Sequence, residues 1–229
     1  MPSLPSYMLR TAFLLTLFAV TCTLLVAYTF RVTHDKIAES EREALLRNLH
    51  SVVNEQYYDN DLFNDYITMT SAKLLGTTDP VPVFRARKQG RPVAAIFTPI
   101  APNGYSGAIK LIVGINYDGT LSGVRVLEHH ETPGLGDAIE ERRSHWIFQF
   151  DGKSLNNPDD KAWKVKRDGG QFDQITGATI TPRAVVKAVH NTLLFFNDNK
   201  EQIFTLPSLT ESESSTSSNA DSQTSAAKQ

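Results

Sequence analysis

The sequence predicts an α+β domain, an antiparallel sheet with flanking helices, preceded by a single N-terminal transmembrane helix. Three observations predict this arrangement. An uncharged apolar stretch lies close to the amino end of the 229-residue chain. Short runs with strand-like patterns follow one another in the middle of the chain, and most segments with helical spacing lie on either side of them. Because strands and helices segregate along the chain, the class is α+β.

Residues 11–30 are the predicted transmembrane helix. They are 20 residues without a charge, bracketed by Arg10 and Arg31, and such a helix spans roughly 30 Å, the thickness of a bilayer core. A cleaved signal peptide and a buried core helix are the alternatives. Because residues 26–30 supply no convincing cleavage site, we expect a retained anchor, with residues 1–10 as a short segment before it.

The charges around the span leave its orientation open. Arg10 stands alone before it, whereas Arg31, Lys36, Arg42 and Arg47 follow it, mixed with acidic residues. The positive-inside count therefore points weakly away from export of the main domain. Long domains translocate largely regardless of charge, so this count does not decide the side of the membrane.

Behind the span we expect a stalk helix over 31–60, because apolar residues recur at spacings of three and four from about Thr33 to Tyr57. A globular domain follows over 61–206. Residues 207–229 are almost free of large apolar side chains, and we expect a disordered tail. The elements predicted within the domain are strands at 93–97, 108–116 and 121–130 in a meander with a turn at Asp118 and Gly119, a helix at 137–148, a short strand at 163–166 and a helix at 182–197.

Composition excludes several classes of function. Apolar residues make up 41% of the chain, enough for one substantial core, and the formal charge is −2. No long basic stripe with interleaved aromatics is present, so nucleic acid is not expected as a partner. The only cysteine, Cys22, excludes an internal disulfide, an iron–sulfur cluster built by this chain and a cysteine-rich zinc site. Redox chemistry here must use an organic cofactor or none.

The segment 173–190 carries the most chemical information. Thr181 is a good N-cap and Pro182 fits the first helical position, so we expect a helix to begin there. Thr179 then lies just before the amino end of a helix, where free N–H groups and the helix dipole favour a phosphate, and Gly177 with Ala178 lets the backbone approach it. The hydroxyl could hold a phosphate or become esterified to it. The alternative is a capped helix after a turn.

Three motifs extend this interpretation through a resemblance. The sequence DQITGAT at 173–179 matches the D-x-x-[ST]-G-A-T flavinylation motif of the FMN-binding domain found in the RnfG/RsxG and NqrC subunits of membrane redox complexes. The sequences GYSGAI at 104–109 and HETPGLG at 130–136 also resemble segments of that family. The resemblance extends to about Leu206 and is closer to RnfG/RsxG than to NqrC.

The resemblance implies an electron-carrying subunit of an Rnf/Rsx-type complex that couples electron transfer to ion translocation, without turnover alone. It implies FMN joined by a phosphoester to Thr179, a flavin transferase that uses FAD and magnesium for maturation, and other Rnf/Rsx subunits as partners. It also implies a bacterial inner-membrane location, with residues 1–10 as a short cytoplasmic segment and the main domain periplasmic. The implied cofactor-binding residues are Thr179, Asp173, Thr176, Gly177, Ala178, Tyr105, Gly107, Glu131, Thr132, Pro133, Gly134 and Leu135.

Several features admit a second interpretation. The loop 131–136 is either a wall of the flavin pocket or an ordinary strand-to-helix turn. Asp173 either holds a cation during flavin transfer or stabilises its turn through backbone hydrogen bonds. We do not expect a metal site at His129, His130 and Glu131, because neighbouring strand residues point to opposite faces. His190 is expected at the surface or in packing.

The competing functions are a membrane-tethered flavin-binding sensor or regulatory module, and a purely structural anchor. Fold alone does not separate them from an electron carrier. The complete motif at 173–179 favours the carrier, because a binding module does not require an esterifiable threonine before a helix. A serine hydrolase is rejected at 104–107, since the second glycine is misplaced for a nucleophile elbow and a strand follows.

Overall fold

The computed structural model describes residues 4–209, except for several side chains near the two ends of the apolar span and in the segment that follows it. Most of the predicted tail, residues 210–229, lies outside the described residues. The chain divides into two compact units, residues up to Leu45 and residues from Leu46 onward.

The first helix, α1 (Leu4–His50), contains the predicted transmembrane segment. Within it, Met8–Arg31 is long and apolar enough to cross a membrane, with a mean hydropathy of 2.1. The hydroxyl groups of four threonines in this segment each donate to the carbonyl four residues earlier, at 2.8 Å, so the helix satisfies its own polar side chains. These threonines are Thr16, Thr21, Thr23 and Thr29.

The predicted stalk is a direct continuation of α1, and it ends at His50 instead of near Tyr57. The side chain of Asn54 accepts a hydrogen bond from the backbone N–H of Gln56 and starts a separate 3₁₀ turn, η1 (Glu55–Tyr57). Between the two, Val52 packs against the sheet. Its backbone and side chain lie where side chains at Gly114 and Gly123 would stand, so these paired glycines leave room for the segment.

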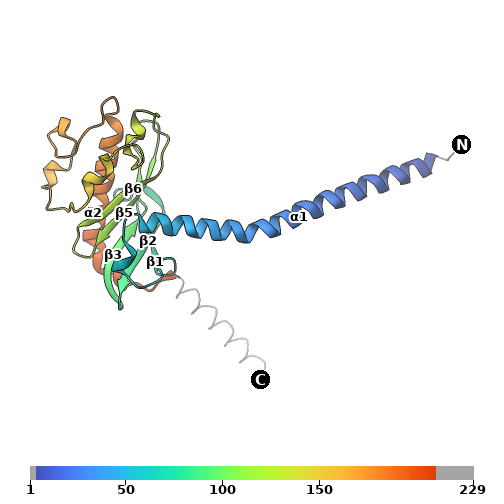
Figure 1. Cartoon of the computed structure of the whole chain (residues 1–229), viewed down its shortest axis with the longest axis horizontal. Helices are drawn as coiled ribbons and strands as arrows, with labels where there is room; N and C mark the ends of the chain where they lie inside the picture. The colour runs from blue at the N-terminus through green and yellow to red at the C-terminus, as the bar shows by residue number, and fades with distance from the viewer. Residues whose placement is uncertain (1–3, 210–229) are drawn as a thin grey trace, which may run out of the picture. The chain divides into compact units, whose positions relative to one another are not determined.

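One antiparallel sheet of six strands forms the centre of the second unit (Figure 1). Four strands are paired in the order β1-β2-β3-β5. Strand β6 pairs with β5 along its other edge. On the first edge of β5, β4 pairs with its beginning and β3 with its end. The strands are β1 (Tyr66–Ser71), β2 (Thr77–Lys88), β3 (Arg91–Phe97), β4 (Ile100–Ala101), β5 (Ile109–Asn116) and β6 (Leu121–Glu128).

The predicted meander is confirmed by β3, β5 and β6 and their antiparallel pairing. The turn at Gly119 has a positive φ of 91°, and its N–H donates to Asn116 at 2.9 Å. The sequence did not predict β1 and β2. Pro80, Pro82 and the charged Arg85 interrupt the apolar alternation of β2, so the periodicity of this segment does not predict a strand.

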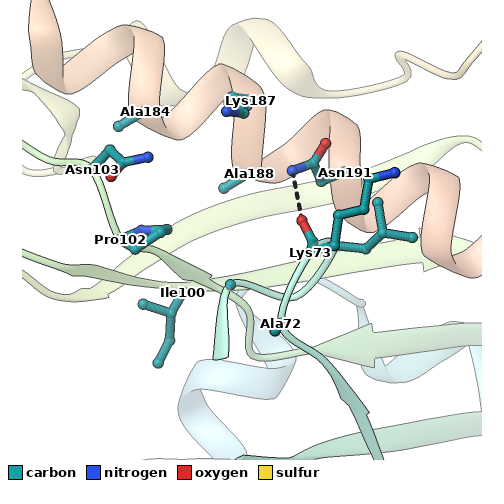
Figure 2. Close-up of a pocket in the computed structure, with 11 residues that line it drawn as sticks. Ala72, Lys73, Ile100, Pro102, Asn103, Ala184, Lys187, Ala188 and Asn191 are labelled. Atoms are coloured by element: carbon teal, nitrogen blue, oxygen red, sulfur yellow. Dashed lines mark hydrogen bonds between the residues drawn. The ribbon is translucent and has the colours of Figure 1, made fainter. Parts of the chain in front are cut away.

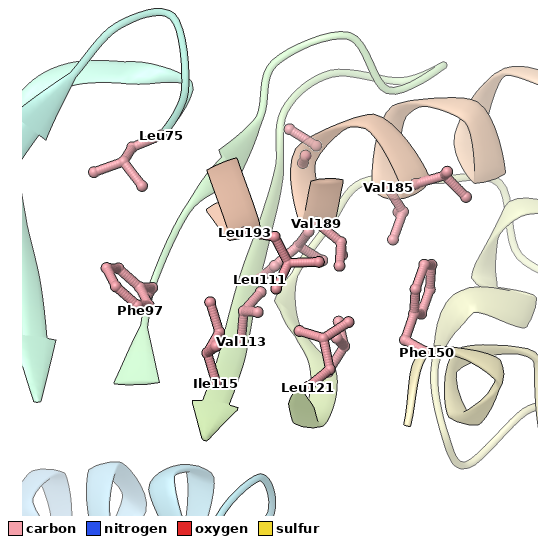
Figure 3. Packing of buried hydrophobic residues seen from close by; sticks show 14 of the residues in the cluster. Leu75, Phe97, Leu111, Val113, Ile115, Leu121, Phe150, Val185, Val189 and Leu193 are labelled. Atoms are coloured by element: carbon pink, nitrogen blue, oxygen red, sulfur yellow. The ribbon is translucent and has the colours of Figure 1, made fainter. Parts of the chain in front are cut away.

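The core lies between the sheet and a long helix, α2 (Ile180–Thr205). Apolar residues on α2 recur at spacings of three and four, so they form one stripe facing the inner side chains of the strands. Full burial of each aliphatic side chain contributes about 1.5–3 kcal/mol. The residues that meet here include Phe97, Leu111, Val113 and Ile115 from the strands and Val185, Val189 and Leu193 from α2 (Figure 3).

Helix α2 extends beyond the predicted 182–197 at both ends. It continues to Thr205 because Ile203 is fully buried, and it stops at Leu206, which precedes Pro207 and takes an extended conformation. The predicted N-cap was wrong. Thr179 occupies that position, and Thr181 is already inside the first turn.

Two further predictions were wrong. The segment 137–148 is not one helix but two 3₁₀ turns, η2 (Gly136–Ile139) and η3 (Trp146–Phe150). Ser144 separates them, because its hydroxyl donates to Ala138 at 2.6 Å and accepts from the N–H of Trp146. At 163–166 there is an isolated bridge between Val165 and Phe172 instead of a strand, flanked by the 3₁₀ turns η4 (Asp160–Ala162) and η5 (Lys166–Asp168).

Candidate functional site

A pocket of about 310 Å³ lies at the amino end of α2. Three segments that are distant in sequence form it: the loop between β4 and β5, the loop after β6, and the turn leading into α2. The lining residues are Tyr105, Glu131, Thr132, Leu135, Gly136, Gly177, Ala178, Thr179, Ile180 and Thr181.

Thr179 is the N-cap of α2, and its side chain makes no capping hydrogen bond. Its hydroxyl is therefore not used by the helix. The first N–H groups of a helix have no acceptor within it, and the backbone N–H groups of Ile180 and Thr181 make no hydrogen bond to any other described residue. A half-buried hydroxyl thus stands beside unsatisfied donors at the positive end of a 26-residue helix dipole, an arrangement that favours a phosphate.

The turn before α2 approaches the loop after β6 closely. Ala178 donates its N–H to Ile175 at 3.1 Å, and Gly177 takes a positive φ of 82°. A Cβ atom at Gly177 would lie 2.8 Å from the Cδ2 atom of Leu135. Glycine is therefore required here for the backbone conformation and for the contact between the two segments.

Glu131 joins the other walls of the pocket. Its side chain is buried, and its carboxylate accepts from the backbone N–H of Ser106 at 3.1 Å and from the hydroxyl of Thr181. Its own backbone N–H donates to Nδ1 of His129, whose Nε2 lies 2.7 Å from Glu140. His129 thus has an acidic partner, and no group of three or more potential metal ligands occurs among the described residues.

The rim of the pocket is apolar and open. Tyr105 is 68% exposed, Leu135 43% and Ile180 44%. The same lining also contains a buried carboxylate and free backbone donors. The pocket therefore combines polar groups with exposed apolar side chains, as a ligand with a charged part and an apolar part requires.

The structure brings together seven of the predicted site residues and leaves five outside the pocket lining. The seven are Tyr105, Glu131, Thr132, Leu135, Gly177, Ala178 and Thr179; the five are Gly107, Pro133, Gly134, Asp173 and Thr176. Gly136, Ile180 and Thr181 line the pocket and were not predicted as site residues. Their signal was available, because Gly136 belongs to the HETPGLG motif and the other two follow Thr179 directly.

Asp173 lies in a separate, open hollow with Lys166, Arg167 and Gln174, and its carboxylate is 2.5 Å from Nζ of Lys166. Its backbone is also held: its N–H donates to Gln149 and its carbonyl accepts from the indole of Trp146, both at 2.7 Å. These backbone bonds agree with a role in stabilising the turn.

A bidentate ion pair joins the start of α2 to the 3₁₀ turn η5. Nε and Nη2 of Arg183 donate to the carboxylate of Asp168 at 2.5 and 2.7 Å. These hydrogen bonds hold the pKa of Asp168 below its ordinary value and raise that of Arg183. The 3₁₀ turn η5 is thereby tied to the first turn of α2.

A second cavity, of about 220 Å³, lies farther along α2 and contains none of the predicted site residues. Figure 2 shows it between the β1–β2 turn, β4 and α2. Asn191 of α2 donates to the carbonyl of Lys73 at 3.4 Å across one end (Figure 2). Small side chains at Ala184 and Ala188 leave the space free.

Comparisons with known proteins agree with the motifs. The FMN-binding domain family matches residues 104–194, and the RnfG N-terminal region matches residues 1–52. The G subunit of an ion-translocating oxidoreductase complex from Shewanella baltica is 52% identical over 200 residues, covering 87% of this chain and 94% of the relative. The corresponding protein of Shewanella oneidensis is 48% identical, with the same coverage.

Among solved structures, the crystal structure of NqrC from Shewanella oneidensis resembles this chain with 25% identity and a TM-score of 0.44. The match covers 67% of this chain and 74% of that one.

Proposed function

Since this chain belongs to the family of G subunits of ion-translocating oxidoreductase complexes, we propose that it carries electrons within such a complex through an FMN esterified to Thr179. The FMN-binding domain matched at 104–194 contains every residue that lines the pocket at the amino end of α2. That pocket is therefore the proposed cofactor site.

The uncapped hydroxyl of Thr179 is the observation that carries the proposal. Attachment forms a bond between Oγ1 of Thr179 and the phosphorus of the FMN half of FAD, while the bridging P–O bond of FAD breaks. AMP leaves with the bridging oxygen, and the hydroxyl proton goes to solvent or to a base of the flavin transferase. No electrons are exchanged in this step. The free N–H groups of Ile180 and Thr181 then face the esterified phosphate.

The residues present fit FMN in both shape and chemistry. When bound, FMN supplies the redox-active isoalloxazine, which the polypeptide itself lacks. A volume of about 310 Å³ lies at the lower end of the range for ligand pockets, about 300–1,000 Å³. The pocket would therefore hold part of the cofactor, beside the exposed Tyr105, Leu135 and Ile180, and the remainder would be accessible to a redox partner.

The proposal includes a membrane anchor. Met8–Arg31 of α1 would cross the bacterial inner membrane once, with the unit from Leu46 onward in the periplasm. There the chain would meet the flavin transferase and the other subunits of its complex. Coupling to ion translocation belongs to the assembled complex, and we expect no turnover from this chain alone.

The experiment uses the full chain, coexpressed with a flavin transferase and purified in detergent. Intact-mass spectrometry and in-gel flavin fluorescence after denaturation should show one FMN adduct on the parent chain and none on Thr179→Ala. Thr205→Ala is the matched control, because Thr205 is an exposed threonine at the other end of the same helix, and it should keep the adduct. An adduct of equal yield on Thr179→Ala would refute the assignment.

A further inference from the structure

Glu131 is a buried acidic side chain in the lining of the proposed cofactor pocket. It is 4% exposed. One carboxylate oxygen, Oε1, accepts from the backbone N–H of Ser106, and the other, Oε2, accepts from the hydroxyl of Thr181. Both donors are neutral, and no cationic side chain is bonded to this carboxyl group.

Two glycines make room for this carboxylate. A Cβ atom at Gly104 would lie 2.3 Å from the carbonyl oxygen of Gly107 and 2.7 Å from Oε1 of Glu131. A Cβ atom at Gly136 would lie 2.8 Å from the Cβ atom of Glu131 and 3.0 Å from its Oε2. Neither glycine has a positive φ, so the backbone conformation alone does not require glycine at these positions. Glu131 fills the space beside Gly136, and it shares the space beside Gly104 with the backbone of Gly107.

The hydrogen bonds of Glu131 connect all three segments of the pocket. Ser106 belongs to the loop between β4 and β5, Glu131 to the loop after β6, and Thr181 to the first turn of α2. A carboxylate offers about four lone-pair positions, and two of them are used by these donors. Its remaining acceptor capacity lies in a group that lines the pocket.

We propose that Glu131 positions the tethered cofactor by accepting a hydrogen bond from a ribityl hydroxyl, and that its charge disfavours reduction of the cofactor. This inference rests on the proposed attachment at Thr179. Thr181, the partner of Glu131, lies only two residues beyond Thr179. The ribityl chain is the part of FMN that directly follows the phosphate, and its hydroxyls are donors. The isoalloxazine is at the far end of FMN from the phosphate, and Tyr105, Leu135 and Ile180 would be the exposed apolar side chains available to it. A negative charge close to the cofactor opposes the addition of electrons, so it lowers the reduction potential.

The test compares Glu131→Gln with Glu141→Gln in the full chain, loaded with FMN by coexpression with a flavin transferase. Glutamine keeps the size of the side chain, and its amide can accept from Ser106 and donate to the hydroxyl oxygen of Thr181. Glu141 is the matched control because it is an acidic residue outside the pocket, paired with Arg125 at 2.6 Å. The measurements are the FMN adduct mass, the thermal midpoint and the reduction potential of the bound flavin.

We expect the potential of Glu131→Gln to become more positive than that of the parent, and the potential of Glu141→Gln to stay at the parent value. A crystal structure of the full parent chain loaded with FMN should place a ribityl oxygen within hydrogen-bonding distance of Glu131. An unchanged potential in Glu131→Gln, or a loaded structure with no ribityl contact to Glu131, overturns the inference. The loaded structure decides the matter even when the variant does not fold. An absent adduct on the parent refutes the attachment itself, which is a different outcome.

Discussion

Replacing Arg85 tests how the carboxyl end of α2 is held to the sheet. Arg85 is a β2 residue with only 2% exposure. Its guanidinium donates to Asp65 through Nε at 2.6 Å and to the carbonyl oxygens of Ile203 and Leu206 through Nη1. Arg85→Met would remove all of these bonds and leave a partly buried carboxylate and two helix-terminal carbonyls without this donor.

The expected loss is large. Asp65 stays paired with Arg87, but the carbonyl oxygens of Ile203 and Leu206 lose a charged donor. Such hydrogen bonds are worth about 1.5–3 kcal/mol each, so the cost should be about 3–5 kcal/mol. In a domain of this size, 1 kcal/mol lowers the thermal midpoint by about 2–4 °C, so Arg85→Met should lower it by about 6–20 °C. The assay is thermal unfolding of the full chain in detergent, followed by circular dichroism.

Arg87→Met is the matched control. Arg87 is on the same strand and bonds the same Asp65, at 2.8 Å, as well as the carbonyl of Phe204, but its side chain is 20% exposed. Hydrogen bonds to charged groups are worth about 1.5–3 kcal/mol before solvent screening, so its loss should cost about 1–2 kcal/mol. If Arg87→Met lowers the midpoint as much as Arg85→Met, burial does not set the cost and the reasoning is wrong.

The same pair of variants separates stability from function. Arg85 lies near the carboxyl end of α2, and Thr179 lies at its amino end, about 39 Å away along a helix of 26 residues. At a temperature where Arg85→Met is folded, it should still carry the FMN adduct. Loss of the adduct from a folded variant would mean that the pocket depends on the far end of α2.

Two further predictions concern His190 and Asp173. Burial lowers the pKa of His190, which stacks on Trp163 and lies 3.0 Å from Asp160. The stability contributed by neutral His190 is therefore complete above the unfolded pKa of about 6.5, and it is lost as pH falls through the lower folded pKa. His190→Gln should thus show a shallower fall of the thermal midpoint between about pH 7 and 5. An equally steep fall in the variant would contradict this. Asp173→Asn breaks an ion pair with Lys166 in which both side chains are 62% exposed, so the free energy of unfolding should change by less than about 1 kcal/mol. A lower FMN adduct yield in this stable variant would favour the role in flavin transfer. An unchanged yield would favour the turn-stabilising role.

The sequence by itself determined the features that depend on neighbouring residues. An uninterrupted apolar stretch predicted the span inside α1, and short strand-like runs bounded by a turn predicted β3, β5 and β6. The turn at Asp118 and Gly119 was predicted because its residue types allow few other conformations. The helix signals that follow the motif at 173–179 predicted a threonine beside the amino end of a helix, and Thr179 is the N-cap of α2.

Only the tertiary structure decided the features that depend on distant contacts. Strand β2 forms although Pro80 and Pro82 interrupt its pattern, because it pairs along most of its length with β1 and β3. Helix α2 continues through a polar run to Thr205 because Ile203 packs in the core and Arg85 binds the last carbonyls. No residue near these positions in the sequence carries that information.

The pocket shows the same division. The three motifs could be found in the sequence, but the bonds from Glu131 to Ser106 and Thr181 span 25 and 50 residues. Local propensity acts over a few residues, whereas a buried carboxylate selects its partners among all the donors that the fold brings within hydrogen-bonding distance. The sequence thus supplied the threonine, and the folded chain supplied the pocket around it.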